Sequence, residues 1–252
     1  FPDTYTAKLA PYQEAFWAWL WAILPSVSPR PHVAVWPRGW AKSTTAEDGT
    51  VSLGARNICS YALYVSGTQQ QADNHVQSIG NRLESATVGE YYPALSERAV
   101  NQYGSSKSWR RSRLWTRHGF IVDALGLDVA IRGVKLGNGR PDLIILDDID
   151  DSTDSPETIQ KKLHELTHTI LAAANPRFCV VMVAQNMVSR NGIVAQLMDG
   201  RADFLANRML NGPHPAIERL VYSGHGKDAI IESGDPTWPY MDLPACQRLI
   251  AR

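Results

Sequence analysis

Residues 32–46 read HVAVWPRGWAKSTTA, and this stretch decides the fold. An apolar run at 32–36 leads into a Pro/Gly turn, and Lys42-Ser43-Thr44 follow at once. This order predicts a strand, a tight loop and a helix, which is the layout of a phosphate-binding loop. In such a loop backbone N–H groups and the helix N-terminus hold a polyphosphate, the lysine neutralises its oxygens and the hydroxyl ligates Mg²⁺.

The loop departs from the usual pattern G-x-x-x-x-G-K-[ST] at both glycine positions. Trp36 occupies the first and Ala41 the second, while Gly39 lies between them. The loop alone therefore leaves a second interpretation open, in which a strand is followed by an ordinary turn and helix. Segments further along the chain have to decide between the two.

Bulk composition is that of a soluble globular protein. The 252 residues are 44% hydrophobic, and 25 Lys and Arg balance 25 Asp and Glu, so no overall basic charge indicates nucleic acid. Cys59 and Cys179 lie in apolar runs, which favours free thiols in a reducing compartment over a zinc module. The longest apolar run, 15–24, is too short to span a bilayer.

Strand and helix patterns alternate along the chain, which predicts an α/β fold with a central, mainly parallel sheet flanked by helices. We expect helices at 7–24, 43–54, 68–86, 156–173 and from 193, and strands at 32–36, 57–67, 142–146 and 178–185. Residues 100–132 alternate short β patterns with turns and predict a β-meander. A further strand is expected at 217–223, and 224–252 is turn-rich.

Four acids follow the apolar strand 142–146. Asp147 and Asp148 end it, and Asp150 and Asp151 come directly after. A carboxylate at the carboxyl end of a central strand faces the crevice where ligands bind in open α/β sheets, and it can hold Mg²⁺ there. A second acid can orient the attacking water, and either Asp148 or Asp150 fits that role.

Arginines near these segments are candidates for stabilising a transition state. Arg38 lies inside the loop, and Arg132 and Arg140 flank the turn before the acidic strand. We expect catalytic roles for Arg38 and Arg132, with Arg140 as the alternative to Arg132.

Several segments match one family in order and spacing. Residues 37–43, PRGWAKS, are similar to its deviant phosphate loop P-R-G-x-x-K-[ST], and residues 66–72, SGTQQQA, to its S-x-T-x-x-Q-A motif. Arg132-Gly133 followed by DLIILDD at 142–148 is similar to its acidic motif, and Tyr12-Gln13 to a site that contacts adenine. The chain resembles, over roughly residues 10–200, the ATPase domain of phage large terminase subunits. The family's coupling motif would fall on 184–186, which departs from the commoner Gly-Thr form.

This resemblance implies a P-loop NTPase of the ASCE type, with residues 1–223 as ATPase domain and 224–252 as a connector toward a nuclease domain that this chain lacks. It implies Mg²⁺ at Ser43 and Asp147, and ATP at Tyr12, Gln13, Pro37, Arg38, Gly39, Trp40, Ala41, Lys42, Ser43 and Thr44. It also implies hydrolysis that drives double-stranded DNA into a procapsid, in the host cytoplasm and not at a membrane. The implied partners are the portal protein, the small terminase subunit and further copies in a ring, with a monomer in isolation. A helicase-like ATPase and a nucleotide-binding module without hydrolysis remain alternatives.

Three other features have competing interpretations. Residues 164–168 read H-E-L-T-H, the spacing of a zinc helix, but no third ligand stands where the extended motif needs one. Trp17, Trp19 and Trp21 favour core packing over a partner-binding stripe. The basic segment 107–117 is either a DNA contact or a solvated hairpin.

Overall fold

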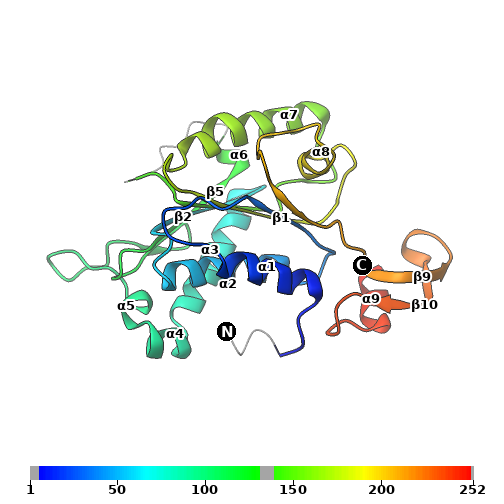
Figure 1. The fold of residues 1–252 in the computed structure, drawn as a ribbon, viewed down its shortest axis with the longest axis horizontal. Helices are drawn as coiled ribbons and strands as arrows, with labels where there is room; N and C mark the ends of the chain where they lie inside the picture. The colour runs from blue at the N-terminus through cyan, green and yellow to red at the C-terminus, as the bar shows by residue number, and fades with distance from the viewer. Residues whose placement is uncertain (1–5, 131–138, 251–252) are drawn as a thin grey trace.

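A computed structural model describes residues 6–130 and 139–250. Eight strands of the described residues form the central sheet: β1 His32–Val35, β2 Tyr61–Ser66, β3 Trp109–Arg110, β4 Arg113–Trp115, β5 Ile121–Gly126, β6 Leu143–Asp147, β7 Val180–Gln185 and β8 Met209–Asn211. Their order is β3-β4-β5-β2-β6-β7-β1-β8 (Figure 1). The six strands from β5 to β8 in this order pair in parallel, and β3 and β4 add an antiparallel edge.

The strand β7 lies between the loop strand β1 and the acidic strand β6. One such additional strand between these two defines the ASCE class, so the predicted fold class is confirmed. Because the strands are parallel, the phosphate-loop candidate after β1 and the acids after β6 lie at the same edge of the sheet.

Helices cover both faces of the sheet (Figure 1). On one face lie α1 Pro11–Trp21, α2 Lys42–Ala55 and α3 Gln69–Leu83, and on the other lie α6 Leu127–Ala130, α7 Pro156–Glu165 and α8 Ile193–Asp199. Side chains of the central strands alternate between the two layers. In β6, for example, Leu143 and Ile145 join the core under α1–α3, while Ile144 and Leu146 join the core under α7 and α8. Burial on both sides explains why these strands read as continuous apolar runs.

Some elements differ from the expectation. The predicted meander at 100–132 is present as β3, β4 and β5, which pair antiparallel in sequence order, and the other edge of β5 pairs in parallel with β2. Two short helices that were not predicted, α4 Ala86–Tyr91 and α5 Pro93–Ser96, precede it. The expected helix at 156–173 is α7 followed by a π-helical turn, Leu166–Ile170, and a 3-10 turn, Leu171–Ala173.

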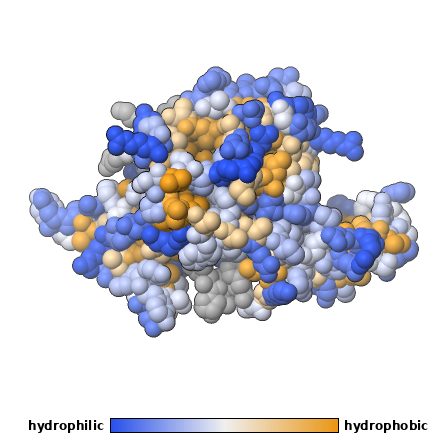
Figure 2. All heavy atoms as spheres, in the orientation of Figure 1, coloured by the Kyte–Doolittle hydropathy of each residue, from blue (hydrophilic) through white to orange (hydrophobic). Residues whose placement is uncertain are grey.

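The C-terminal residues form a small unit of their own at one end of the molecule (Figure 1). The predicted strand at 217–223 is β9 Ile217–Ser223, which pairs with β10 Ile230–Pro236 in a separate hairpin, and α9 Leu243–Ile250 follows. The predicted boundary at 223/224 falls in the turn of this hairpin. Apolar side chains, among them Val221 and Ile230, are exposed on the hairpin, at the right-hand end of Figure 2. No helix among the described residues is both long and apolar enough to cross a bilayer.

His32, the first residue of β1, makes stability depend on pH. Its ring packs against Phe16 and Trp19 with centroids 5.2 and 4.9 Å apart, and burial lowers the pKa of His32 from 6.5 to about 4. Between these two values the unfolded chain holds a proton at this position that the folded chain excludes. The contribution of neutral His32 is therefore complete above pH 6.5 and is lost as the pH falls toward 4.

We expect this single group to lower the free energy of unfolding by about 2–3 kcal/mol between pH 7 and pH 4.5. Urea denaturation at the two pH values measures the loss. A His32→Phe variant keeps an aromatic ring but cannot titrate, so it should lose about that much less. An equal loss in variant and wild type contradicts the prediction.

Candidate active site

The loop between β1 and α2 turns through two residues in the left-handed region, although only one of them is glycine. Gly39 and Ala41 have φ angles of 85° and 56°, the left-handed region that glycine adopts without strain. Ala41, at the second glycine position of the usual pattern, thus holds a conformation that favours glycine. The rings of Trp36 and Trp40 are buried in the core and anchor the loop. The two tryptophans therefore stabilise the loop conformation by packing into the core beneath it.

Strain at Ala41 can be measured. An alanine in the left-handed region is strained by about 1–2 kcal/mol, while glycine adds entropy to the unfolded chain. We expect Ala41→Gly to raise the free energy of unfolding by about 0.5–1 kcal/mol and to leave nucleotide binding intact. Denaturant unfolding and ADP titration check both parts. A destabilised Ala41→Gly chain would show that the methyl group packs favourably enough to outweigh the strain.

Lys42 opens α2 and is the central cation of the site. Its side chain is buried, with 8% exposed, yet the described residues give it neither a hydrogen bond nor an ion pair. Burial lowers the pKa of Lys42, the charges of Asp148 and Asp147 oppose the shift, and Arg38 adds to it. A buried cation without a direct partner is costly, which indicates a site made for an anion.

Two neighbouring pockets meet at this lysine. One, of about 470 Å³, is lined by Thr6, Ala7, Arg38, Gly39, Ala41, Lys42, Ser43, Thr44, Asp148, Trp238 and Tyr240. The other, of about 500 Å³, lies over the carboxyl ends of β2, β6 and β7 and includes Gly67, Thr68, Gln71, Gln185 and Asn186. Arg38, Lys42 and Asp148 line both. The exposed Arg38 thus lies with Lys42 where the two pockets join.

Asp147, the last residue of β6, is fully buried behind the loop. Burial raises the pKa of Asp147 to about 6, and Asp148 acts in the same direction, while His75 and the hydroxyls of Tyr64 and Ser43 lower it. The Tyr64 hydroxyl donates to Oδ2 of Asp147 at 2.6 Å, whereas Oδ1 has no hydrogen-bond partner.

A charged network that the sequence did not indicate holds Asp147 from behind. His75 on α3 places Nε2 3.5 Å from Asp147 Oδ2 and Nδ1 2.7 Å from Glu47 Oε1, and its ring stacks on Tyr64. Arg82 in turn contacts Glu47 at 2.8 Å. Burial lowers the pKa of His75, but Glu47 and the nearby aspartates outweigh it, so the net pKa is raised. His75 therefore links the carboxylate at the end of β6 to Glu47.

Asp148 lines both pockets, whereas Asp150, Asp151 and Asp154 line only the second. Its φ of 47° turns the chain sharply after β6, and strain of this kind concentrates at functional sites. Its backbone is held on both sides, because Asp148 N donates to Ala184 O at 3.2 Å and Gly67 N donates to Asp148 O at 3.1 Å. Its Oδ1 is buried without a hydrogen-bond partner.

Asp150 has a different partner. Its two carboxylate oxygens accept the backbone N–H groups of Ile193 and Val194 at 2.7 and 2.9 Å. Burial raises the pKa of Asp150, and these two N–H donors oppose the shift. The side chain therefore satisfies the N-terminus of α8, and of the two candidate acids only Asp148 keeps an unpaired oxygen beside Lys42.

The remaining predicted site residues are not brought together. Tyr12 and Gln13 are buried and line neither pocket. The Gln13 side chain accepts a hydrogen bond from Ala10 N at 2.9 Å and donates one to Trp40 O at 3.3 Å, so it supports the loop. Arg132 lies outside the described residues. Arg140 lies at the amino end of β6, opposite Asp147, where it caps the carbonyls of Ala172 and Ala174.

The residues at the edge of the sheet fit a magnesium ion bound together with phosphates. Ser43 supplies a hydroxyl, and Asp147 supplies a carboxylate with one unpaired oxygen; the unpaired hydroxyl of Ser66 lies beside it on β2. The described residues hold no group of three or more His, Cys, Asp or Glu side chains placed for a metal. Mg²⁺ in nucleotide sites needs only one or two protein ligands, because phosphate and water complete its shell.

The same observation weighs against zinc at 164–168. The rings of His164 and His168 lie 4.4 Å apart, but no third ligand joins them among the described residues. The basic segment 107–117 is largely engaged in internal contacts. Arg113 pairs with Asp123 and Arg117 with Glu97, which leaves less free charge than the sequence indicates.

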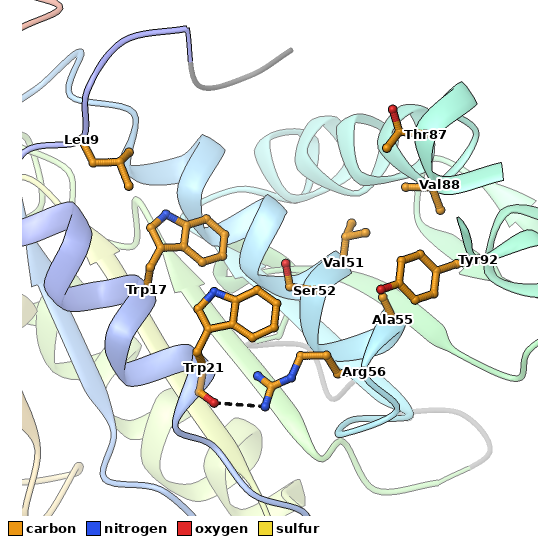
Figure 3. Close-up of a pocket in the computed structure, with 10 residues that line it drawn as sticks. All are labelled: Leu9, Trp17, Trp21, Val51, Ser52, Ala55, Arg56, Thr87, Val88 and Tyr92. Atoms are coloured by element: carbon orange, nitrogen blue, oxygen red, sulfur yellow. Dashed lines mark hydrogen bonds between the residues drawn. The ribbon is translucent and has the colours of Figure 1, made fainter. Parts of the chain in front are cut away.

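The tryptophans of α1 have divided roles. Trp19 is buried, as expected for core packing, whereas Trp21 is 57% exposed beneath the guanidinium of Arg56. Trp17 and Trp21 line a mostly apolar pocket of about 490 Å³ between α1, α2 and α4 (Figure 3). None of its lining residues belongs to the phosphate loop or the acidic strand.

The missed residues share one weak signal. Glu47, Asp48 and His75 are polar side chains on helix faces that are otherwise buried. Buried charged groups are almost always paired. Charged residues at helix positions that face the core could therefore have indicated the network. Trp238 and Tyr240 carry no such signal, because only the folded chain brings them to the loop.

No family model matches the chain, and none of the curated proteins matches it. Among solved structures, the ATPase domain of the Thermus phage P74-26 large terminase is similar at 16% identity and a TM-score of 0.44, over 73% of this chain and 67% of that one. An arginine-to-alanine variant of that domain has 14% identity and a TM-score of 0.46, over 73% and 68%. The C-terminal domain of a possible DNA helicase from Lactobacillus plantarum has 12% identity and a TM-score of 0.38, over 82% of this chain and 100% of that one. Two of these three structures are large terminase ATPase domains, the family that the sequence resembles.

Proposed function

We propose that this chain hydrolyses ATP at the edge of the sheet where β1, β6 and β7 end. The observation that carries the proposal is the convergence of a buried, unpaired Lys42 with two aspartates that have unpaired oxygens, after a loop with two left-handed residues. Cationic and anionic groups that do not satisfy one another fit an anion with a divalent cation.

Each group then has a role. The N–H groups of the loop and Lys42 hold the β- and γ-phosphates, and Arg38 stabilises charge on the γ-phosphoryl group as it is transferred. The Ser43 hydroxyl and the Asp147 carboxylate would hold Mg²⁺, which would supply positive charge to neutralise the phosphates. Asp148 accepts a hydrogen bond from the attacking water and orients it in line with the leaving oxygen.

The work done with this energy is proposed to be translocation of double-stranded DNA into a procapsid by a ring of copies on a portal, with a small terminase subunit as further partner. The support is the ordered set of sequence segments, with residues 1–223 as motor and 224–252 as connector. Arg132 would act from a neighbouring copy. If it does, mixing an Arg132→Ala chain with a Lys42→Ala chain partly restores hydrolysis under assembly conditions, and a mixture that stays inactive assigns Arg132 a role within its own chain.

A nucleotide-binding module without hydrolysis is the second candidate, favoured by Asp at 148 where such ATPases usually have Glu. Steady-state phosphate release from ATP, with Lys42→Ala as control, separates the two. If the wild type releases phosphate no faster than Lys42→Ala, the hydrolysis proposal is wrong and the nucleotide-binding module remains.

DNA contact at the basic segment needs a variant chosen from the structure. Arg113 is paired with Asp123, so its removal would disturb the sheet edge, whereas the exposed Arg110 has no ion pair among the described residues. We expect Arg110→Ala to weaken duplex binding by a few-fold and to reduce the salt slope by about one. Fluorescence anisotropy at several salt concentrations measures both. An unchanged slope removes Arg110 from the DNA surface.

A further inference from the structure

The C-terminal unit reaches the phosphate loop. Trp238 and Tyr240 follow β10 and line the 470 Å³ pocket opposite the loop. Trp238 is buried, and its indole N–H donates to Lys8 O at 3.2 Å. The helix α9 also touches the loop, since a Cβ on Gly39 would lie 3.3 Å from Leu249 Cδ1. The wall that carries the two aromatic rings is therefore anchored to the loop and to the N-terminal segment.

Tyr240 is placed as a platform. Its ring centroid lies 4.9 Å from that of Trp238 with 34° between the planes, and 60% of the residue is exposed. The Tyr240 ring thus packs against a buried, hydrogen-bonded indole, while much of the phenol is open to solvent. Exposed aromatic rings held in this way offer a stacking surface to a planar ligand.

The 470 Å³ pocket has one end beside Lys42, where phosphates would bind, and another beside Trp238 and Tyr240. The three residues common to both pockets, Arg38, Lys42 and Asp148, mark where the terminal phosphate and the water would meet. A bound nucleotide would extend from there along Ser43 and Thr44 through the 470 Å³ pocket. The residues left to contact its base are Thr6, Ala7, Trp238 and Tyr240, because Gln13 is buried and bonded on both sides.

We propose that Tyr240, supported by Trp238, is the surface on which the base of a bound nucleoside phosphate stacks. This inference rests on the proposed nucleotide site and assigns its base-binding wall to the C-terminal unit. The wall therefore binds a nucleoside phosphate through its base and contributes nothing to a ligand that has phosphates alone.

The test compares ADP with inorganic pyrophosphate, both with Mg²⁺, by titration calorimetry on the full chain. Removing an aromatic stack weakens binding of a base by about tenfold. We expect Tyr240→Ala to weaken ADP binding about tenfold and to leave pyrophosphate binding unchanged, with Tyr240→Phe close to wild type for both. Tyr222→Ala removes an equally exposed tyrosine from β9, far along the hairpin, and should change neither.

The alternatives separate cleanly. If wild type binds both ligands and Tyr240→Ala binds ADP as well as wild type does, the stacking assignment is overturned while the phosphate site stands. The assignment is also overturned if Tyr240→Ala weakens ADP and pyrophosphate equally. A wild type that binds neither ligand overturns the proposed nucleotide site and this inference with it.

Discussion

Replacing Lys42 by alanine should abolish most hydrolysis and leave the fold intact. The ammonium is the buried cation beside the phosphate position, and removing one such electrostatic contact lowers kcat by at least about 10²-fold. Phosphate release at saturating ATP measures the loss. Lys161→Ala, the same change on the exposed face of α7, is the matched control and should retain wild-type kcat.

Removing the charge of Lys42 should stabilise the fold while it abolishes activity. Lys42 is buried without a direct partner in the described residues, so its charge destabilises the folded chain when no nucleotide is bound. Lys42→Met keeps the packing of the stem and removes the charge. We expect it to raise the free energy of unfolding by about 1 kcal/mol while being as inactive as Lys42→Ala. A Lys42→Met chain that is less stable than wild type would show that the lysine is a structural residue.

The second large effect separates Asp148 from Asp150. Asp148→Asn keeps the shape of the side chain and tolerates the positive φ, but it removes the charge that we propose orients the attacking water. We expect kcat to fall by about 10²–10³-fold and ADP affinity to change by less than threefold. Single-turnover hydrolysis and ADP titration report the two quantities separately.

Asp150→Asn is the matched variant two residues away. It halves the acceptors at the N-terminus of α8 and removes the charge there, so the free energy of unfolding should fall by about 1–2 kcal/mol. Its kcat should stay within a few-fold of wild type. If Asp150→Asn is the inactive variant and Asp148→Asn the active one, the two roles are exchanged.

The local sequence pattern predicted the central strands of the sheet and the two segments that carry the candidate site. The apolar runs at β1, β2, β6 and β7 are buried on both sides, so their composition alone indicated parallel strands. The Pro/Gly turn and Lys42 indicated the loop, and the acids after β6 indicated the opposite half of the site. The hairpin β9–β10 was only half predicted, since the pattern of 217–223 indicates a strand but not its partner.

Residue roles depended on what each side chain contacts in the folded chain. Asp148 and Asp150 are equivalent in the sequence, and they differ because the N-terminus of α8, more than forty residues away, binds one of them. Tyr12 and Gln13 precede the loop in the sequence, where the resemblance implies residues that contact adenine. In the folded chain they are buried, and Gln13 donates to the backbone of the loop at Trp40.

By itself, then, the sequence determined an α/β sheet with a lysine loop and an acidic strand end, because strand burial and turn chemistry are properties of short segments. Tertiary structure alone decided which acid stays unpaired, that His75 links Asp147 to Glu47, and that Tyr240, near the end of the described chain, lines the pocket beside the loop. These residues are distant in the sequence, 28 positions apart in the case of Glu47 and His75, and no local periodicity reports such contacts.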